Sequence, residues 1–387
     1  MMTSSTEGSE LRSTVRAVRS RAPLRMSLAG GGTDVPPYPS MFGGAVISMT
    51  INRYAWCSIT RANSDEIVVR SIDLNQTATF TSSTTPVFDG NLDLVKAIFG
   101  RLNVIDPHGL RIVLETDAPP GSGLGSSSAL VVAAIAALSR YYGLNLTPYE
   151  IAKVAYVVER EDIGIAGGMQ DQYSASYGGF NLIEFHENDV VEVMPLRLSE
   201  AMRCELEAHL LLCFTGSTRS SGGILERQIQ NVVNSEISTM NSLHELKGLT
   251  TTMRKALHAE DLPTLASLLD DAWNRKKLLT TGISDPHLDS IYETAKHHGA
   301  LGGKLLGAGG GGYFMFLTEP ERREELSHVL EPLGVTVSRN IELCDTGVTS
   351  WEVPRIRQEV PSSFDRVSNS EISTNHEGVK SVDTRVR

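Results

Sequence analysis

The residues with the clearest chemical potential are alternating glycines followed by serines, in the stretch Pro119–Ser128 (PPGSGLGSSS). The residues before it, Leu110–Thr116, place apolar side chains at alternate positions, which predicts a β-strand. The residues after it, Ala129–Arg140, are apolar on almost every side, which predicts a buried helix. A helix N-terminus reached through a glycine turn offers free backbone N–H groups, and serine hydroxyls beside them can contact phosphate or a metal ion. The stretch therefore predicts an anion site.

The same stretch has a plainer interpretation, which is a tight strand–helix connection with a serine as the helix cap. Two known nucleotide motifs do not fit it. No lysine follows the last glycine, Gly125, as a Walker loop requires. No ribose-binding acid is evident about 20 residues further on, as dinucleotide-binding folds require. Taken alone, the motif leaves the anion site and the structural turn both open.

A second group of polar residues lies near the N-terminus. Arg19, Arg21 and Arg25 occupy positions of the same parity, so a regular strand would place them on one face. Such a face is more often a solvated edge than a binding site. Here, however, the glycine turn Gly30–Asp34 (GGGTD) follows at once and directs a threonine and an aspartate toward a common point.

Acidic residues gather at the end of the helix predicted for Pro148–Glu161. Glu159, Glu161 and Asp162 lie where the helix dipole disfavours negative charge, so we expect a cation near them unless they form a solvated cap. A glycine pair follows this acidic group and precedes Asp171.

A third glycine-rich stretch is Gly302–Phe316 (GGKLLGAGGGGYFMF). Each glycine costs backbone entropy on folding, so a structural turn alone does not account for this density. A backbone that lies close against a ligand does.

Composition excludes several classes of protein. The chain has 387 residues and a formal net charge of -11, which argues against a nucleic-acid surface. No stretch approaches the roughly 18 continuous apolar residues of a membrane helix, and residues 1–20 lack the apolar segment of a secretory signal. The cysteines, at positions 57, 204, 213 and 344, lack metal-ligand spacing. We expect a cytoplasmic enzyme that binds small molecules, and neither nucleic acid nor membrane.

The predicted elements form two α+β domains, at 15–195 and 196–353, between disordered tails at 1–14 and 354–387. Residues 188–205 are expected to be an irregular crossover between the domains. We further expect helices at 222–247 and 249–258, and a helix that begins at an Asn91 cap.

Taken in order, the motifs resemble those of the GHMP kinases, a superfamily that includes galactokinase, homoserine kinase and mevalonate kinase. The resemblance rests on RAPLR with GGTD, on PPGSGLGSSS and on KLLGAGGGG, and the stretch GGMQDQ resembles the galactokinase loop that carries the catalytic aspartate. It extends from about residue 20 to residue 353. It implies a two-domain α+β fold, with an N-terminal domain like ribosomal protein S5 domain 2 and a ferredoxin-like C-terminal domain.

The resemblance also implies phosphoryl transfer with ATP and Mg²⁺. Asp171 would be catalytic, and Arg25 would keep this aspartate ionised and neutralise charge in the transition state. Ser127 and Glu159 would hold the metal. The nucleotide would be bound by the second motif, at Pro120, Gly121, Ser122, Gly123, Leu124, Gly125, Ser126, Ser127 and Ser128.

Within the superfamily, the closest resemblance is to the D-glycero-α-D-manno-heptose 7-phosphate kinases, through PLRMSLAGGGTD and EREDIGIAGGMQDQY. Those enzymes phosphorylate the anomeric hydroxyl to make a 1,7-bisphosphate. Another acceptor, such as L-fucose or an octose 8-phosphate, and a non-catalytic sensor of the same fold remain open as alternatives. A homodimer is also compatible with the resemblance.

The acceptor would be contacted by the first and third motifs, at Gly31, Gly32, Thr33, Asp34, Gly309 and Gly310. A sugar phosphate that enters a protein of net charge -11 needs local basic residues. We expect Arg219 and Lys304 to serve this purpose. Arg275 and Lys276 are further candidates, although the run Arg275–Lys277 is typical of a solvated helix face.

Overall fold

The computed structural model describes residues 17–353, apart from 63, 82–86, 106–107 and 219–221. These residues belong to one compact unit, Met1–Pro354, and a second unit, Arg355–Arg387, lies wholly outside the described residues. The tails predicted at 1–14 and 354–387, and Arg219, therefore also fall outside them.

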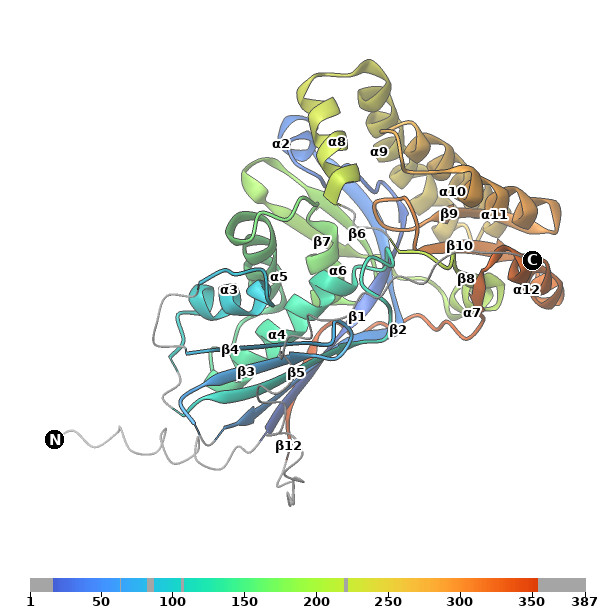
Figure 1. Cartoon of the computed structure of the whole chain (residues 1–387). Helices are drawn as coiled ribbons and strands as arrows, with labels where there is room; N and C mark the ends of the chain where they lie inside the picture. The colour runs from blue at the N-terminus through green and yellow to red at the C-terminus, as the bar shows by residue number, and fades with distance from the viewer. Residues whose placement is uncertain (1–16, 63, 82–86, 106–107, 219–221, 354–387) are drawn as a thin grey trace, which may run out of the picture. The chain divides into compact units, whose positions relative to one another are not determined.

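An eight-stranded mixed sheet organises the first part of the unit (Figure 1). Its order is β12-β1-β2-β5-β3-β4, and β6 and β7 extend it from the first half of β2. Only β3 and β5 pair in parallel among the described strands. The strands are β1 (Ala17–Ala29), β2 (Gly44–Arg61), β3 (Ile67–Ser71), β4 (Gln76–Phe80), β5 (Leu110–Thr116), β6 (Phe180–Phe185), β7 (Val191–Pro195) and β12 (Thr349–Val353).

Helices pack against this sheet, and the central one is α4 (Ser126–Tyr142), which contacts β1 and β2. Most of its side chains are buried, as its apolar composition predicts. Helix α5 (Pro148–Val157) begins with the capping box of Thr147 and Glu150. The remaining elements here are α2 (Tyr38–Phe42), α3 (Asp93–Leu102), the π-helical turn η1 (Val158–Asp162), α6 (Gln170–Tyr177) and η2 (Glu187–Asp189).

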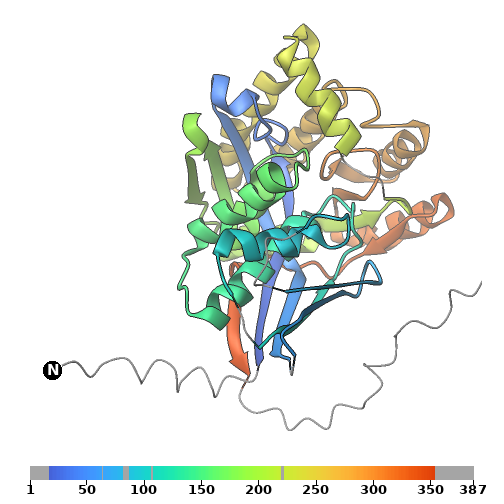
Figure 2. The same ribbon diagram turned by 60° about the vertical axis from the view of Figure 1, so that its left-hand side comes forward.

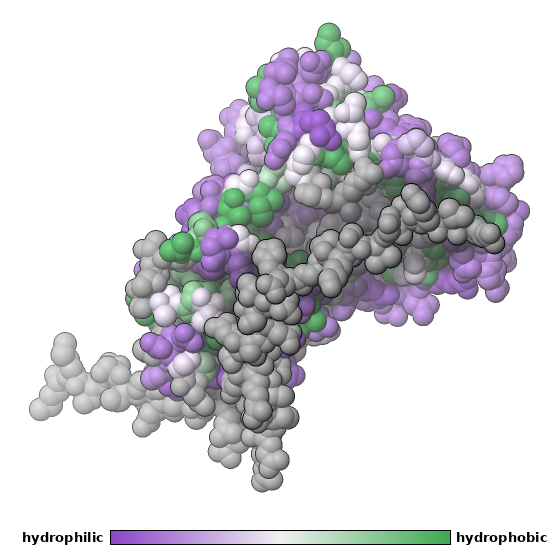
Figure 3. Space-filling model, viewed as in Figure 1, coloured by the Kyte–Doolittle hydropathy of each residue, from purple (hydrophilic) through white to green (hydrophobic). Residues whose placement is uncertain are grey.

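A four-stranded antiparallel sheet, in the order β11-β8-β10-β9, organises the second part. Its strands are β8 (Leu210–Phe214), β9 (Ala300–Leu305), β10 (Tyr313–Thr318) and β11 (Thr336–Ser338). The helices are α7 (Glu200–His209), α8 (Gly222–Val233), α9 (Ile237–His258), α10 (Leu262–Lys277), α11 (Pro286–His297) and α12 (Arg323–Leu330), with short η3 (Pro320–Arg322) and η4 (Glu331–Leu333). Polar side chains cover much of the outer face of these helices in Figure 3. The two sheets, with helices around both, confirm the predicted α+β class.

The two parts share a hydrophobic core. The largest cluster of buried apolar residues joins Leu24 and Ile47 of the first sheet to Leu265 of α10 and Met315 of β10. Helix α9 contacts β1, β2 and α10, so it packs on both parts. β12, which the sequence groups with the second domain, pairs instead with β1, and Figure 2 shows it beside that strand.

Three predicted elements differ from the structure. Residues 188–205 are not an irregular crossover, because β7 pairs with β6 and α7 begins within the segment. Helices α8 and α9 are separated at 234–236, where Ser235 has a φ of 55°, and not at Gly248. Gly248 is exposed, and α9 tolerates this one glycine within the helix. Helix α3 begins after Leu92 rather than at an Asn91 cap.

Helix α10 lies very close to β9, and a glycine permits the contact. A Cβ atom at Gly302 would stand 1.9 Å from the carbonyl oxygen of Ala266. Helix α10 carries Lys276, and β9 leads into the loop of the third glycine motif. The position of that motif therefore depends on this close approach.

We predict that Gly302→Ala destabilises the protein by about 1–3 kcal/mol, because α10 and β9 must separate to admit the methyl group. Gly248→Ala is the matched control. Nothing lies within 4 Å of a Cβ at this helical position, so the change should stabilise α9 by up to about 1 kcal/mol. Denaturant midpoints measure both effects, and equal midpoints for the two variants would contradict the close packing.

Candidate active site

A polar cavity of about 200 Å³ lies where the three glycine motifs meet. Its walls come from β1 and the turn after it, the start of α4, the segment 159–171, helices α8 and α10, and the loop between β9 and β10. Of the predicted site residues, the following line it: Arg25, Gly31, Gly32, Asp34, Gly121, Gly123, Gly125, Ser126, Ser127, Ser128, Glu159, Asp171 and Gly309. Residues that are far apart in the sequence thus meet at one place.

The start of α4 forms one wall of this cavity. Gly121, Gly123 and Gly125 have φ angles of 74°, 83° and 73°, a left-handed conformation that side chains disfavour. Gly125 is the N-cap of α4, and no side chain caps this helix. The serine-cap interpretation is therefore wrong, and the N–H groups of the first turn have no side-chain acceptor. A helix start of this kind suits an anion.

Three members of the second motif lie elsewhere. The side chains of Ser122 and Leu124 are buried, and they line neither this cavity nor the second cavity described below. The carbonyl oxygen of Ser122 accepts a hydrogen bond from the Tyr313 backbone N–H at 3.0 Å, which ties the second motif to the third. Pro120 lines the second cavity only.

Arg25 and Asp171 form a buried ion pair beside the cavity. The Arg25 side chain, of which 5% is exposed, places Nε 2.8 Å and Nη2 2.7 Å from Oδ1 of Asp171. Nη1 donates a hydrogen bond to the carbonyl oxygen of Gly123. No described residue donates a hydrogen bond to Oδ2 of Asp171, so this oxygen remains free to accept a proton from a ligand.

Asp34 lines the same cavity. Its carboxylate accepts hydrogen bonds from the Gly32 N–H at 3.1 Å and from the Gln170 side chain at 3.1 Å. Burial, together with the nearby charge of Asp171, raises the pKa of Asp34. Thr33 points away from the cavity wall, and its hydroxyl donates to the Ala45 carbonyl oxygen within the fold.

Glu159 is as deeply buried as Asp34, with 1% of the residue exposed. It accepts hydrogen bonds from Ser128 Oγ at 3.0 Å and from Gln172 Nε2. Burial raises the pKa of Glu159, and no described ion pair includes it. Ser127 lines the same cavity, and the serine that is hydrogen-bonded to the acid is Ser128.

The cation expected near the other acids of this turn is Arg101. Its guanidinium lies 2.6 Å from Asp162 and 3.5 Å from Glu161. These two acids therefore form a surface ion-pair group on α3 and η1, and neither lines the cavity.

The basic residues that we expected to contact a phosphate lie at different depths in the structure. Lys276 is buried and lines the cavity, and its Nζ donates to the carbonyl oxygens of Leu305 and Gly307 at 2.9 and 2.6 Å. Lys304 is also buried but lines only a small adjoining cavity. Arg275 lies at the surface, 2.9 Å from Glu245.

In the third motif, Gly309 lines the cavity and Gly310 does not. The backbone N–H of Gly310 donates instead to the carbonyl oxygen of Ile283 at 2.9 Å. Arg219 lies outside the described residues, so its expected role stays a prediction.

A second cavity, of about 310 Å³, was not predicted from the sequence. It shares Ser126 and Ser127 with the first cavity and is mainly apolar, with walls from β3, β5, α3 and α4 that include Leu92, Leu94, Ile98, Leu130 and Val131. Each of these residues fits an ordinary core pattern, so no local signal marks them as a site. Gln228 and Leu279, which line the first cavity from the second part of the unit, likewise have no local signal in the sequence that marks them as site residues.

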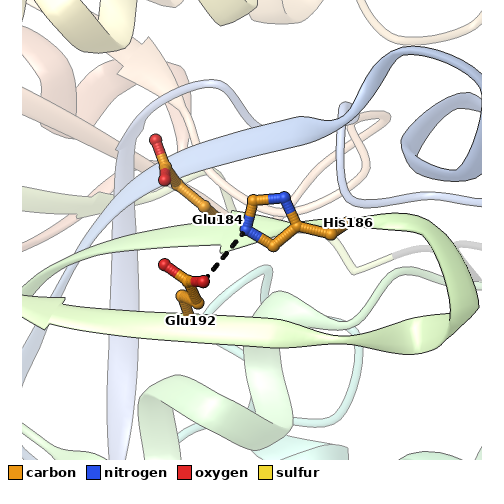
Figure 4. A group of neighbouring side chains, drawn as sticks. All are labelled: Glu184, His186 and Glu192. Atoms are coloured by element: carbon orange, nitrogen blue, oxygen red, sulfur yellow. Dashed lines mark ion pairs between the residues drawn. The ribbon is translucent and has the colours of Figure 1, made fainter.

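Glu184, His186 and Glu192 form a separate polar group on the β6–β7 hairpin (Figure 4). His186 Nε2 lies 3.8 Å from Glu192, and the group lines neither cavity. Exposed acids beside a histidine are common, and we assign no role to this group.

Comparison with known proteins places the chain in a family. Residues 92–179 match the N-terminal domain of the GHMP kinases, and residues 253–332 match their C-terminal domain. The chain is 37% identical over 343 residues to the D-glycero-alpha-D-manno-heptose 7-phosphate kinase of Campylobacter jejuni, an alignment that covers 88% of this chain and 100% of that protein.

Two further comparisons are more distant or more partial. A crystal structure of a D-glycero-D-manno-heptose 1-phosphate kinase from Bacteroides thetaiotaomicron is 34% identical, with a TM-score of 0.73 over 87% of this chain and 99% of that one. The L-fucokinase/L-fucose-1-P guanylyltransferase of Bacteroides fragilis is 27% identical, over 80% of this chain and 35% of that protein.

The Campylobacter relative aligns over its whole length, and both family domains occur in the same order as the three glycine motifs. The chain is therefore a member of the GHMP kinase family.

Proposed function

We propose that this protein transfers the γ-phosphoryl group of ATP to the anomeric hydroxyl of D-glycero-α-D-manno-heptose 7-phosphate and so forms the 1,7-bisphosphate. The observation that carries the proposal is the Arg25–Asp171 pair at a cavity bounded by the three glycine motifs. The acceptor is inferred from the 37% identity to the Campylobacter heptose 7-phosphate kinase, which extends over that whole protein.

The two adjoining cavities suit the two halves of ATP. The uncapped start of α4 offers backbone N–H groups and a helix dipole to the triphosphate. The apolar second cavity, joined to the first at Ser126 and Ser127, suits a purine ring. In this arrangement the terminal phosphate points toward Arg25 and Asp171, which line the first cavity.

The donors around Glu159 fit Mg²⁺. This ion prefers carboxylate and hydroxyl oxygens together with phosphate, and the cavity presents the Glu159 carboxylate beside the hydroxyls of Ser127 and Ser128. The acid lacks an ion-pair partner among the described residues, so a bound cation would also balance its charge. When bound, Mg²⁺ would neutralise negative charge on the ATP phosphates.

The chemistry then depends on Asp171 and Arg25. The free oxygen Oδ2 accepts the proton of the attacking hydroxyl, while the guanidinium holds Oδ1 and fixes the carboxylate in place. The same guanidinium places positive charge beside the phosphoryl group as negative charge shifts during transfer. An anomeric hydroxyl is more acidic than an ordinary alcohol, which makes proton removal by a carboxylate easier.

L-fucose is a weaker candidate for the acceptor. The fucokinase relative is 27% identical, and the alignment covers only 35% of that protein. Lys276 and Lys304 also place two buried amines next to the Arg25 end of the cavity, which suits a phosphorylated acceptor better than a neutral sugar.

We predict that Asp171→Asn lowers the turnover of heptose 7-phosphate with ATP by at least about 10²-fold, the scale of general-base catalysis. The fold and ATP binding should be retained, because asparagine can still accept a hydrogen bond from Arg25. Steady-state kinetics and calorimetric ATP binding measure these effects. Asp162→Asn is the matched control, since that acid lies on the neighbouring surface turn and pairs with Arg101. Turnover near that of the wild type in the Asp171 variant would remove Asp171 from the mechanism.

We also predict that Glu159→Gln raises the Mg²⁺ concentration needed for half-maximal activity, because the neutral amide binds the ion more weakly than a carboxylate does. A Mg²⁺ titration at fixed ATP measures the change. Glu161→Gln, which removes an exposed acid next to Arg101, should leave the titration unchanged. If the two variants titrate alike, the metal is held elsewhere.

A further inference from the structure

Two buried amines next to the active site lack an acidic partner. Lys276, in the last turn of α10, and Lys304, in β9, are 7% and 3% exposed. None of the ion pairs of the described residues includes either lysine. Each donates instead to backbone carbonyl oxygens, Lys276 to two of them and Lys304 to that of Leu28 at 3.1 Å. A buried ammonium group without a counter-charge is costly, so this arrangement needs an explanation.

The two amines and Arg25 surround a small cavity of about 20 Å³. This volume admits about one water molecule. Ser27 Oγ and Gln170 Oε1 are buried, and neither has a hydrogen-bond partner although both residues line the cavity. Ser27 is only 5% exposed. The cavity is therefore a built polar site in which two buried polar atoms are not satisfied by the protein itself.

This small cavity adjoins the main one. Arg25, Gly31, Gln170, Lys276 and Gly307 line both. Lys276 thus reaches the space where substrates bind, whereas Lys304 lies one layer behind it. Asp171 is already paired with Arg25, and no ion pair of the described residues joins Asp34 to either lysine.

We propose that Lys276 and Lys304 form a cation pair that is charge-balanced only when a phosphate group binds at this end of the active-site cavity. Lys276 contacts the phosphate directly. Lys304 acts from behind, through its charge and through a water molecule shared with Ser27 and Gln170. The phosphate is either the one the acceptor already carries or the one being transferred. The inference rests on the proposed function for the identity of the acceptor, but not for the presence of a phosphate.

The charge state of the pair links this site to pH. Burial, and then the charges of Lys304 and Arg25, lower the pKa of Lys276 well below its usual range. Burial, and then Arg25, lower the pKa of Lys304 to about 7. The charged groups that line the main cavity together with Lys276 are Arg25 from β1, Asp34 from the turn after it, Glu159 and Arg160 from η1, and Asp171 from α6.

The direction in which phosphate affinity changes with pH follows from the lowered pKa values of the two lysines. Above pH 7 the free protein loses the Lys304 proton, and a phosphate dianion favours the charged form and raises this pKa again. Phosphate binding at pH 8 must therefore take up a proton. For the same reason, affinity for phosphate should fall as pH rises above 7.

The linkage can be tested by calorimetric titration at pH 8 in two buffers with different ionisation enthalpies. The probes are inorganic phosphate and heptose 7-phosphate. We expect the wild-type protein to take up a proton with each probe. Lys304→Met should take up less proton than the wild type, and Lys276, whose pKa is also lowered by burial, accounts for what remains. The same variant should bind phosphate about tenfold or more weakly, the loss that corresponds to one charge-assisted interaction. Arg275→Met is the matched control, because it removes a neighbouring charge on α10 that lies at the surface and pairs with Glu245, and it should match the wild type.

Kinetics identify which phosphate is bound. If Lys276 and Lys304 hold the acceptor's own phosphate, Lys276→Met and Lys304→Met each raise the KM for heptose 7-phosphate and leave the KM values for ATP and unphosphorylated heptose unchanged. If they hold the transferred group, kcat falls for both acceptors. A purely structural role for Lys276, which anchors the loop at Gly307, would instead raise every KM together and leave the proton uptake intact.

The inference and the proposed function fail in different ways. Lysine-dependent proton uptake with inorganic phosphate, in a protein that does not turn over heptose 7-phosphate, supports the inference and overturns the proposed acceptor. Normal turnover of heptose 7-phosphate, with proton uptake and kinetic constants unchanged in both lysine variants, overturns the inference alone. Failure of the wild-type protein to bind either probe at pH 8 also overturns it.

Discussion

The guanidinium group of Arg25 is the contact on which the site depends. It joins Asp171 on α6 and the carbonyl oxygen of Gly123 in the glycine loop, so one side chain of β1 fixes two other segments. Arg25 can reach both because β1 is the buried strand against which α4 and α6 pack. The proposed catalytic arrangement is therefore an outcome of how the first sheet packs, and not of any one loop.

A second constraint sets the position of the opposite wall. Gly123 has no Cβ, and one placed there would lie 2.7 Å from the Leu306 carbonyl oxygen, so the second and third motifs pack backbone against backbone. Lys276 then holds the third motif through Leu305 and Gly307. These contacts close the cavity around Arg25, with Lys276 at the same end and Lys304 in the small adjoining cavity behind it. An enzyme that handles phosphates in a protein of net charge -11 needs such a local excess of positive charge.

The sequence predicts the class of the fold and the meeting of its motifs because glycine spacing and apolar periodicity are local signals. The strand Leu110–Thr116, the buried helix α4 and the capping box at Thr147 follow directly from such patterns. Features that depend on tertiary packing leave no such local signal in the sequence. Neither the pairing of β12 with β1 nor the apolar second cavity has a local signature. The run Arg275–Lys277 looks uniformly solvated, yet Lys276 is buried, because only the packing of α10 on β9 decides which of its side chains points inward.

The central claim is that the site assembled around Arg25 and Asp171 phosphorylates an anomeric hydroxyl. The most direct measurement is ³¹P NMR of the product formed from ATP and heptose 7-phosphate by the purified full chain. The account predicts a new phosphate signal that couples to the anomeric proton, while the original 7-phosphate signal is retained. A product phosphorylated at any other position, or release of inorganic phosphate without transfer to the sugar, would contradict it.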